Sequence, residues 1–380
     1  PGQRAATVHG DGPLLILAGA GSGKTRVITR RIAWLMHCRN VQPGEILAIT
    51  FTNKAAGELR ERCAKLGVGP GAWIATFHAA CARILRRDIE HLAGYTRDFT
   101  IYDTDDRSKL IRDLIKAEGF DTTAFKPGDV GAWISARKSR AEAFEPATGD
   151  EIGVHEQVCG RVWRAYEAAM HKNNALDFDD LLLKVLELFE RHPGVRDAYA
   201  RRFRNILVDE YQDTNRVQYR FLRHLTTFHS NIAVCGDPDQ SIYGWRGADV
   251  RNILDFERDF GGARVVKLEE NYRSTQNILD AAQAVIRNNV QRKEKELRSQ
   301  KGPGDKLVVL QCADEDEEAR EIVLDIRSQT DAGRRHDHFA IFYRANFMQR
   351  ALERALRLAS IPYQIVAGTE RLQHVGRFEA

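Results

Sequence analysis

The stretch Ala18-Gly19-Ala20-Gly21-Ser22-Gly23-Lys24-Thr25 decides which fold this chain can adopt. It follows the apolar run 14–17 and opens an amphipathic helical pattern over residues 25–38. Its glycines let the backbone wrap closely, so that N–H groups face phosphate oxygens, and the following helix adds partial positive charge. Lys24 would reach the β- and γ-phosphates of a nucleotide, and Thr25 would hold Mg²⁺. The sequence therefore predicts a strand, a phosphate-binding loop and a helix, although Ala18 stands where the general pattern has glycine.

Length and composition set broad limits on the function. The 380 residues are enough for two or three domains, and 43 % hydrophobic and 29 % charged residues are ordinary for a globular protein. No apolar run approaches the roughly 18 residues that span a bilayer, and no signal-peptide pattern is present. The six cysteines include no C-x-x-C pair, which argues against disulfides or zinc and indicates the reducing cytoplasm. The net charge of +4 only weakly indicates a polyanionic partner.

Short apolar runs alternate with helical patterns, which predicts a parallel α/β sheet. The runs expected as strands are residues 14–17, 46–49, 73–75, 206–208, 232–234 and 265–268. Between about 105 and 200 helical patterns dominate, so we expect a helical insertion into this sheet. A second α/β pattern follows the linker-like stretch 292–305, with strands expected at 307–310, 339–342 and 363–366 and helices at 315–328 and 346–358.

Two adjacent carboxylates follow the apolar run 206–208, in the stretch Asp209-Glu210-Tyr211-Gln212-Asp213. A buried strand that delivers two acids to its carboxyl end suits nucleotide hydrolysis. Asp209 would hold Mg²⁺, and Glu210 would orient and deprotonate the attacking water, a role worth about 10²–10⁴ in rate. The alternative is a strand end with solvated acids.

Six motifs then occur in a specific order: residues 18–25, Thr50-Phe51-Thr52-Asn53-Lys54-Ala55-Ala56, Thr76-Phe77-His78, residues 209–213, Gly236-Asp237-Pro238-Asp239-Gln240-Ser241-Ile242-Tyr243-Gly244-Trp245-Arg246-Gly247-Ala248, and Asn271-Tyr272-Arg273-Ser274. Together they resemble the helicase motifs of the UvrD/Rep/PcrA group of superfamily 1 DNA helicases. The resemblance runs from Gln3 to about Tyr363.

The resemblance implies an ATP-dependent DNA helicase that moves 3′ to 5′ on single-stranded DNA and unwinds duplexes in repair or replication. It implies a RecA-like ATPase domain of residues 1–104 and 201–275, a helical insertion of residues 105–200, and the first part of a second RecA-like domain, residues 276–380. Members of the group continue well beyond residue 380, and residues 370–380 depart from their pattern. We therefore expect a part of a longer helicase, which leaves open that this part alone is inactive.

The resemblance also implies roles at the nucleotide. Gln3 would read the adenine base, and Tyr272 would stack on it. Gln240 would contact the γ-phosphate and couple it to DNA, while Arg273 would act as an arginine finger. The expected cofactors are ATP and Mg²⁺, and the expected catalytic residues are Lys24, Asp209, Glu210, Gln240 and Arg273. The alternatives are an exposed terminal position for Gln3, a place in the core for Tyr272 and a structural salt bridge for Arg273.

A path for single-stranded DNA is implied by two further sets of residues. Tyr243, Trp245 and Arg246 lie within six residues of Gln240, so a base-stacking platform and a γ-phosphate contact share one loop. The other set follows two expected strands and comprises Phe51, Thr52, Asn53, Thr76 and His78. Hydroxyl and amide contacts to phosphates would give binding that does not read base sequence. The alternative for this second set is ordinary helix capping.

The partners implied are single-stranded DNA, junctions of single- and double-stranded DNA, and repair or replication proteins. Two other functions stay open. The chain could be a nucleotide-gated DNA- or protein-binding module without complete catalysis, because the resemblance stops within the second domain. It could also be a P-loop kinase for a small metabolite, which would not explain the loop 240–246. The His336-Asp337-His338 run has no third metal ligand nearby in sequence and indicates a surface loop.

Overall fold

The computed structural model describes residues 1–141, 153–290 and 292–366, without the side chain of Arg246. The chain divides into two compact units, Pro1–Asp305 and Lys306–Ala380, which are described separately here. The expected departure at residues 370–380 lies outside the described residues. Within the described part, no helix combines the length and the apolar character needed to cross a membrane.

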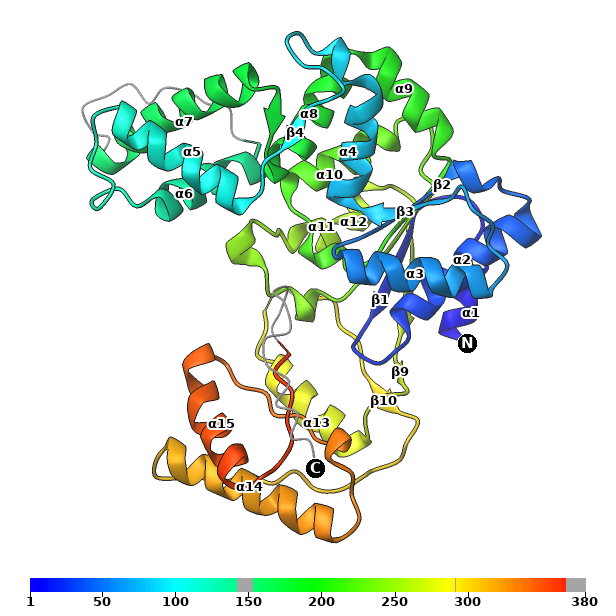
Figure 1. Ribbon diagram of the computed structural model, residues 1–380. Helices are drawn as coiled ribbons and strands as arrows, with labels where there is room; N and C mark the ends of the chain where they lie inside the picture. The colour runs from blue at the N-terminus through cyan, green and yellow to red at the C-terminus, as the bar shows by residue number, and fades with distance from the viewer. Residues whose placement is uncertain (142–152, 291, 367–380) are drawn as a thin grey trace. The chain divides into compact units, whose positions relative to one another are not determined.

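A six-stranded sheet forms the centre of the first unit (Figure 1). Its strands are β1 (Leu14–Ala18), β2 (Ile46–Thr50), β3 (Trp73–Thr76), β6 (Asn205–Val208), β7 (Ile232–Gly236) and β8 (Arg264–Leu268), in the order β3-β2-β6-β7-β1-β8. All neighbours are parallel. The six strands expected from the sequence are thus confirmed. Because the strands are parallel, their carboxyl ends share one edge, where α/β proteins bind ligands.

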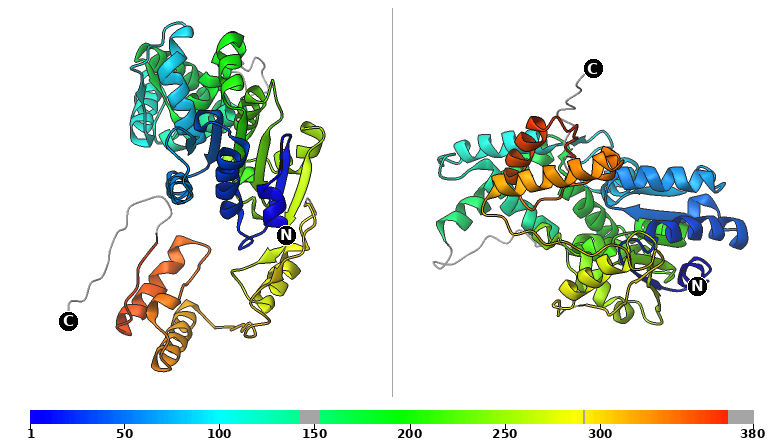
Figure 2. Two further views of the ribbon diagram at one scale, coloured as in Figure 1. Left: turned by 90° about the vertical axis from the view of Figure 1, so that its right-hand side faces the viewer. Right: turned by 90° about the horizontal axis from the view of Figure 1, so that it is seen from below.

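Helices cover both faces of this sheet (Figures 1 and 2). They are α1 (Gly2–Thr7), α2 (Lys24–Arg39), α3 (Asn53–Lys65), α4 (Phe77–Asp88), α8 (Phe178–Arg191), α9 (Pro193–Arg202), α10 (Arg216–Leu225), α11 (Arg251–Leu254) and α12 (Phe256–Asp259). The first unit also contains α13 (Gln276–Ile286), which lies away from the sheet (Figure 1). Leu15 and Leu47 pack into a core with α4, α8, α9 and α10, whereas Leu14 and Ile46 pack with α2 and α3. This alternation follows the two-residue period of a strand.

Three helices between β3 and β6 form their own core: α5 (Thr104–Ala117), α6 (Pro127–Ser139) and α7 (Val154–Lys172). Asp103 caps α5 by accepting hydrogen bonds from the Asp105 and Asp106 amides, both at 2.9 Å. Two short parallel strands, β4 (Thr100–Ile101) and β5 (Ala175–Leu176), pair at the base of these helices. Helices therefore dominate residues 105–200 as expected, while α8 and α9 join the core of the sheet. The exact domain ranges stay a prediction.

The second unit contains α14 (Glu315–Asp331) and α15 (Gln349–Leu358), which pack around Val323, Ile326, Leu356 and Ile361. Both helices were expected, although residues 346–348 form a 3₁₀ turn. The strands expected at 307–310, 339–342 and 363–366 were wrong, because none of these runs is a strand in the described residues. A strand requires hydrogen-bonded neighbours, and here several apolar side chains of these runs stay exposed, such as Val309 at 92 % and Phe342 at 93 %.

Candidate nucleotide and DNA site

The loop from β1 to α2 has the backbone that a phosphate-binding loop needs. Gly21 and Gly23 have positive φ of 74° and 92°, and the amide and hydroxyl of Ser22 donate to the Gly19 carbonyl at 3.3 and 2.7 Å. A Cβ atom added to Gly21 would lie 2.6 Å from the Cβ of Arg273. Only glycine fits this position, since the neighbouring turn approaches so closely. Lys24 and Thr25 then begin α2, at the positive end of its dipole.

Lys24 brings the loop together with the acids that follow β6. Its Nζ atom donates to Glu210 Oε2 at 2.8 Å and to Gln240 Oε1 at 3.3 Å. Burial is the largest single influence on the pKa of Lys24 and lowers it, but the charge and the hydrogen bond of Glu210, together with smaller contributions that include Asp209, outweigh burial, so that this pKa is raised. Glu210 has a left-handed backbone with φ of 51°, which turns the chain sharply at the end of the strand. Three of the expected catalytic residues are thus in direct contact.

The carboxylates beside Lys24 have altered acidity. Burial, and then the charge of Glu210, raise the pKa of Asp209 to about 6. The same two causes, in the same order, raise the pKa of Asp213 to about 6. One oxygen of Asp213 is buried without a hydrogen-bond partner. Negative charge therefore accumulates at the carboxyl end of β6 beyond what Lys24 neutralises.

This donor set fits a magnesium ion. Within the described residues, no group of three or more His, Cys, Asp or Glu side chains could hold a metal ion alone. Magnesium commonly takes one or two protein ligands and completes its shell with water and substrate phosphates. Thr25 and Asp209 are the residues that would hold it, and its charge would offset the crowding of Asp209, Glu210 and Asp213.

The turn that carries Tyr272 and Arg273 packs on the phosphate-binding loop. Asn271 Nδ2 donates to the Ala20 carbonyl at 2.6 Å, and the Tyr272 amide donates to the Gly21 carbonyl at 3.0 Å. No hydrogen bond or ion pair occupies the Arg273 guanidinium in the part of the chain described here. Tyr272 is 45 % exposed and donates its hydroxyl to Glu270. Both side chains therefore stand beside the loop with surfaces available to a ligand.

Gln3 also reaches this loop, from α1. Its Nε2 atom donates to the Ser22 carbonyl at 2.8 Å, and it lies 2.6 Å from where a Cβ on Gly23 would be. The amide is thus close to the phosphate-binding loop, although nothing here tests its expected contact with adenine.

The second set of residues expected on the DNA path lies at the carboxyl ends of β2 and β3, at the same edge of the sheet. Thr52 and Thr76 accept hydrogen bonds from the Ala55 and Ala79 amides at 3.1 and 3.2 Å, and so cap α3 and α4. Capping uses only the oxygen as an acceptor, so each hydroxyl hydrogen can still donate to a phosphate. Capping and DNA contact are therefore compatible roles for these two threonines.

Aromatic side chains support this part of the edge. Phe51 packs edge-on against the buried Phe77, with ring centroids 5.7 Å apart, and His78 packs against Phe178. Burial lowers the pKa of His78, which favours its neutral form. Asn53 is exposed at the start of α3. The surface thus offers neutral hydrogen-bonding groups next to a fixed aromatic ring.

The loop after β7 links Gln240 to Trp245. Trp245 is 75 % exposed and Tyr243 39 % exposed, while the side chain of Arg246 lies outside what the structure describes. Hydrogen bonds tie both ends of this loop to the segment after Glu210. Ser241 Oγ donates to the Gln212 carbonyl at 3.2 Å, and the Asp249 amide donates to the Thr214 carbonyl at 2.9 Å. A movement of the acids would therefore reach the aromatic loop directly.

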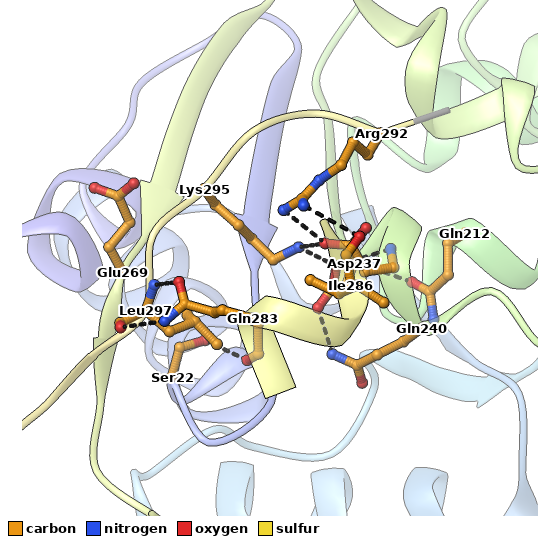
Figure 3. Close-up of polar contacts among 12 residues, drawn as sticks. Ser22, Gln212, Asp237, Gln240, Glu269, Gln283, Ile286, Arg292, Lys295 and Leu297 are labelled. Carbon is orange, nitrogen blue, oxygen red and sulfur yellow. Dashed lines mark hydrogen bonds and ion pairs between the residues drawn. The ribbon is translucent and has the colours of Figure 1, made fainter. Parts of the chain in front are cut away.

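Sequence reasoning missed an ionic cluster behind Gln240 (Figure 3). Asp237 and Asp239 follow β7, and both contact Lys295, while Arg292 lies 3.3 Å from Asp239. Asp237 in turn accepts a hydrogen bond from Gln240 Nε2 at 2.6 Å. Both aspartates lie in the motif 236–248, but nothing in the sequence singled them out, because their burial and their pairing with Lys295 arise only in the folded chain.

Fold and site together define a P-loop nucleotide-binding unit with an exposed aromatic loop on the same sheet edge. The chain matches the UvrD/REP helicase N-terminal domain over residues 1–261 and the UvrD-like helicase C-terminal domain over residues 266–373. It therefore belongs to the UvrD/REP helicase family.

Two curated relatives carry the name ATP-dependent DNA helicase PcrA. The one from Staphylococcus epidermidis is 45 % identical over 361 residues, which cover 94 % of this chain and 49 % of the relative. The one from Staphylococcus aureus is 44 % identical over 369 residues, or 96 % of this chain and 50 % of the relative. The chain thus spans about half the length of these relatives.

Proposed function

We propose that this chain is the ATP-binding part of a DNA helicase that moves 3′ to 5′ along single-stranded DNA. The observation that carries the proposal is the contact of Lys24 with both Glu210 and Gln240. These three residues come from three segments at one sheet edge, and the loop after Gln240 presents Trp245 to solvent. The names of the PcrA relatives support the same activity.

The residues divide the work of hydrolysis among them. Lys24 and Arg273 would neutralise charge on the γ-phosphate, and Glu210 would accept a proton from the attacking water. A magnesium ion held by Thr25 and Asp209 would supply further charge neutralisation at the phosphates. Gln3 and Tyr272 would hold the base.

Coupling to DNA would run through the loop after β7. Stacking of a base on an aromatic side chain is worth about 1–3 kcal/mol, which is comparable to the mean stacking of about 1.4 kcal/mol per base-pair step. A change at Gln240 that moves Trp245 would therefore matter on the scale of one base pair. Phe51, Thr52, Asn53, Thr76 and His78 would hold the strand by its backbone, together with Tyr243 and Arg246.

The decisive experiment measures ATP hydrolysis by this chain with and without a single-stranded oligonucleotide. We expect stimulation by the oligonucleotide, and loss of hydrolysis in Lys24→Ala. Turnover that ignores the oligonucleotide would contradict the proposal. Unwinding of a 3′-tailed duplex, with a 5′-tailed duplex as the control, tests the direction. We also propose that the protein works in the reducing cytoplasm.

A second candidate is a nucleotide-gated DNA-binding module that does not unwind. One observation favours it: the apolar runs 307–310, 339–342 and 363–366 form no strands in the described residues. Within the described residues a second RecA-like sheet is then not formed, and the closing of two motor domains over ATP would lack one partner. Nucleotide-dependent DNA binding without unwinding of the 3′-tailed duplex would favour this candidate.

A further inference from the structure

The segment after α13, residues 292–297, returns to the nucleotide site in a fixed register. Leu297 and Gln283 exchange two hydrogen bonds, at 3.0 and 3.2 Å, and β10 (Arg298–Ser299) pairs with β9 (Glu270–Asn271). The Leu297 side chain lies 2.7 Å from where a Cβ on Gly19 would be. This 292–297 segment is therefore packed directly against the phosphate-binding loop.

Lys295 is the central charge of this segment. Its side chain is 4 % exposed, and its Nζ atom contacts Asp237 Oδ1 and Asp239 Oδ2, whose side chains are 4 % and 7 % exposed (Figure 3). Arg292 contacts Asp239 from the same segment. Burying two carboxylates is costly unless cations pair with them, so the position of Asp237 depends on Lys295.

The position of Asp237 in turn fixes the orientation of the Gln240 side chain. Its second oxygen, Oδ2, accepts the hydrogen bond from Gln240 Nε2 at 2.6 Å. An amide has one donating and one accepting end, so holding Nε2 on a carboxylate leaves Oε1 as the end that faces the site. That oxygen lies 3.3 Å from Lys24 Nζ. A continuous chain of contacts therefore runs from Lys295 through Asp237 and Gln240 to Lys24.

We propose that Lys295 is a positioning residue for nucleotide hydrolysis, which acts by holding Asp237 so that Gln240 turns its carbonyl oxygen toward the ammonium group of Lys24. The proposal rests on the proposed function, because it assigns a purpose to the orientation of Gln240. It makes the 292–297 segment part of the ATPase machinery, although none of its side chains needs to touch the nucleotide.

A purely structural role for Lys295 would predict something different. Whether the role of Lys295 is structural or positioning, Lys295→Met removes the cation that pairs with two buried carboxylates, so we expect a lower free energy of unfolding. Only the positioning role makes the loss of hydrolysis depend on Gln240. A double-mutant cycle separates the two, since residues that act in one chain give non-additive effects.

The experiment measures kcat and KM for ATP, and the free energy of unfolding, in the wild-type chain, Lys295→Met, Gln240→Ala and the double variant. We expect Lys295→Met to lower kcat about 10- to 100-fold, the cost of misplacing a group near the reaction, with KM changed less than about threefold. In the Gln240→Ala background the same substitution should change kcat less than about twofold. The loss of stability should be equal in both backgrounds. Lys295→Arg, which keeps the charge, should recover most of the wild-type kcat.

Lys293→Met is the matched control. Lys293 lies two residues before Lys295 in the same segment, but it pairs with Glu257, outside the chain of contacts that leads to Gln240. It should leave kcat within about twofold of wild type. An equal loss of kcat from Lys295→Met in both backgrounds would overturn the positioning role and leave the proposed function standing. A wild-type chain that hydrolyses no ATP would overturn the proposed function, and the role of Lys295 with it.

Discussion

The ammonium group of Lys24 lies 2.8 Å from a carboxylate oxygen of Glu210, across a sequence separation of 186 residues. The residue proposed to bind phosphate is thus held by the residue proposed to activate water. A γ-phosphate that binds Lys24 would compete with Glu210 for the same ammonium group. Glu210 would then be free to accept a proton from water only once the nucleotide has arrived.

Lys24→Ala is expected to lower ATP hydrolysis at least about 100-fold, because the transferred phosphoryl group loses a positioned cation. A phosphate-release assay measures the rate. Lys65→Ala is the control, since Lys65 is an exposed lysine that pairs with Glu61 on α3. Hydrolysis that survives in Lys24→Ala would place the nucleotide elsewhere.

Glu210→Gln should separate binding from catalysis. An amide still fills the space but cannot accept the proton, so we expect kcat to fall about 10²–10⁴-fold while ATP affinity stays within about threefold. Single-turnover kinetics with a fluorescent nucleotide measures both. The control is Glu58→Gln, an exposed carboxylate that pairs with Arg62. Equal losses of affinity and rate would instead make Glu210 a binding residue.

Trp245→Ala is expected to weaken binding of single-stranded DNA by about 1–3 kcal/mol, the usual value of one base–aromatic stack. Fluorescence anisotropy with a labelled oligothymidine at fixed salt gives the affinity. Phe228→Ala is the control, because Phe228 is 45 % exposed but precedes β7, at the opposite edge of the sheet. Nucleotide affinity without DNA should be unchanged in both variants. A similar loss in both would indicate a nonspecific effect of removing aromatic surface.

Asp209→Asn should stabilise the chain at neutral pH when no metal or nucleotide is present. The pKa of Asp209 is raised to about 6 in the folded chain, so folding favours its protonated form. The stability of the wild-type chain should therefore decline as pH rises from about 4 to about 7, and Asp209→Asn should reduce that decline to the part that Asp213 contributes. We expect a gain of about 1–3 kcal/mol at pH 7 and none at pH 4, measured by urea unfolding. Magnesium with ATP should reverse the order of the two proteins at pH 7.

The sheet could be predicted because each strand is a short buried apolar run between turn residues, as residues 14–17 and 206–208 illustrate. The runs 307–310 and 363–366 look the same in sequence and are not strands. An apolar pattern indicates that a segment can be buried, but it does not indicate whether a neighbouring strand is present to form hydrogen bonds with it.

The candidate site also contains residues that the sequence predicted and residues that it did not. Lys24 and Glu210 lie in compact motifs, so short-range spacing predicted their meeting at one edge. The pairing of Lys295 with Asp237 joins segments 58 residues apart, and nothing in the local sequence distinguishes this lysine from its solvated neighbours. Its importance follows only from burial, which is a property of the folded chain.

The closed loop between Gln240 and Asp249 has a consequence for hydrogen–deuterium exchange. The amide of Asp237 donates to Gln212 Oε1 at 3.0 Å and that of Asp249 donates to the Thr214 carbonyl, so both protons should exchange slowly. Between them lie Tyr243 and Trp245, on an exposed 3₁₀ turn whose amides should exchange quickly. One proteolytic peptide that spans residues 236–250 would therefore contain slowly exchanging amides near both ends and rapidly exchanging amides at its centre. Mass spectrometry of that peptide could show whether an adenine nucleotide slows deuterium uptake at the aromatic turn.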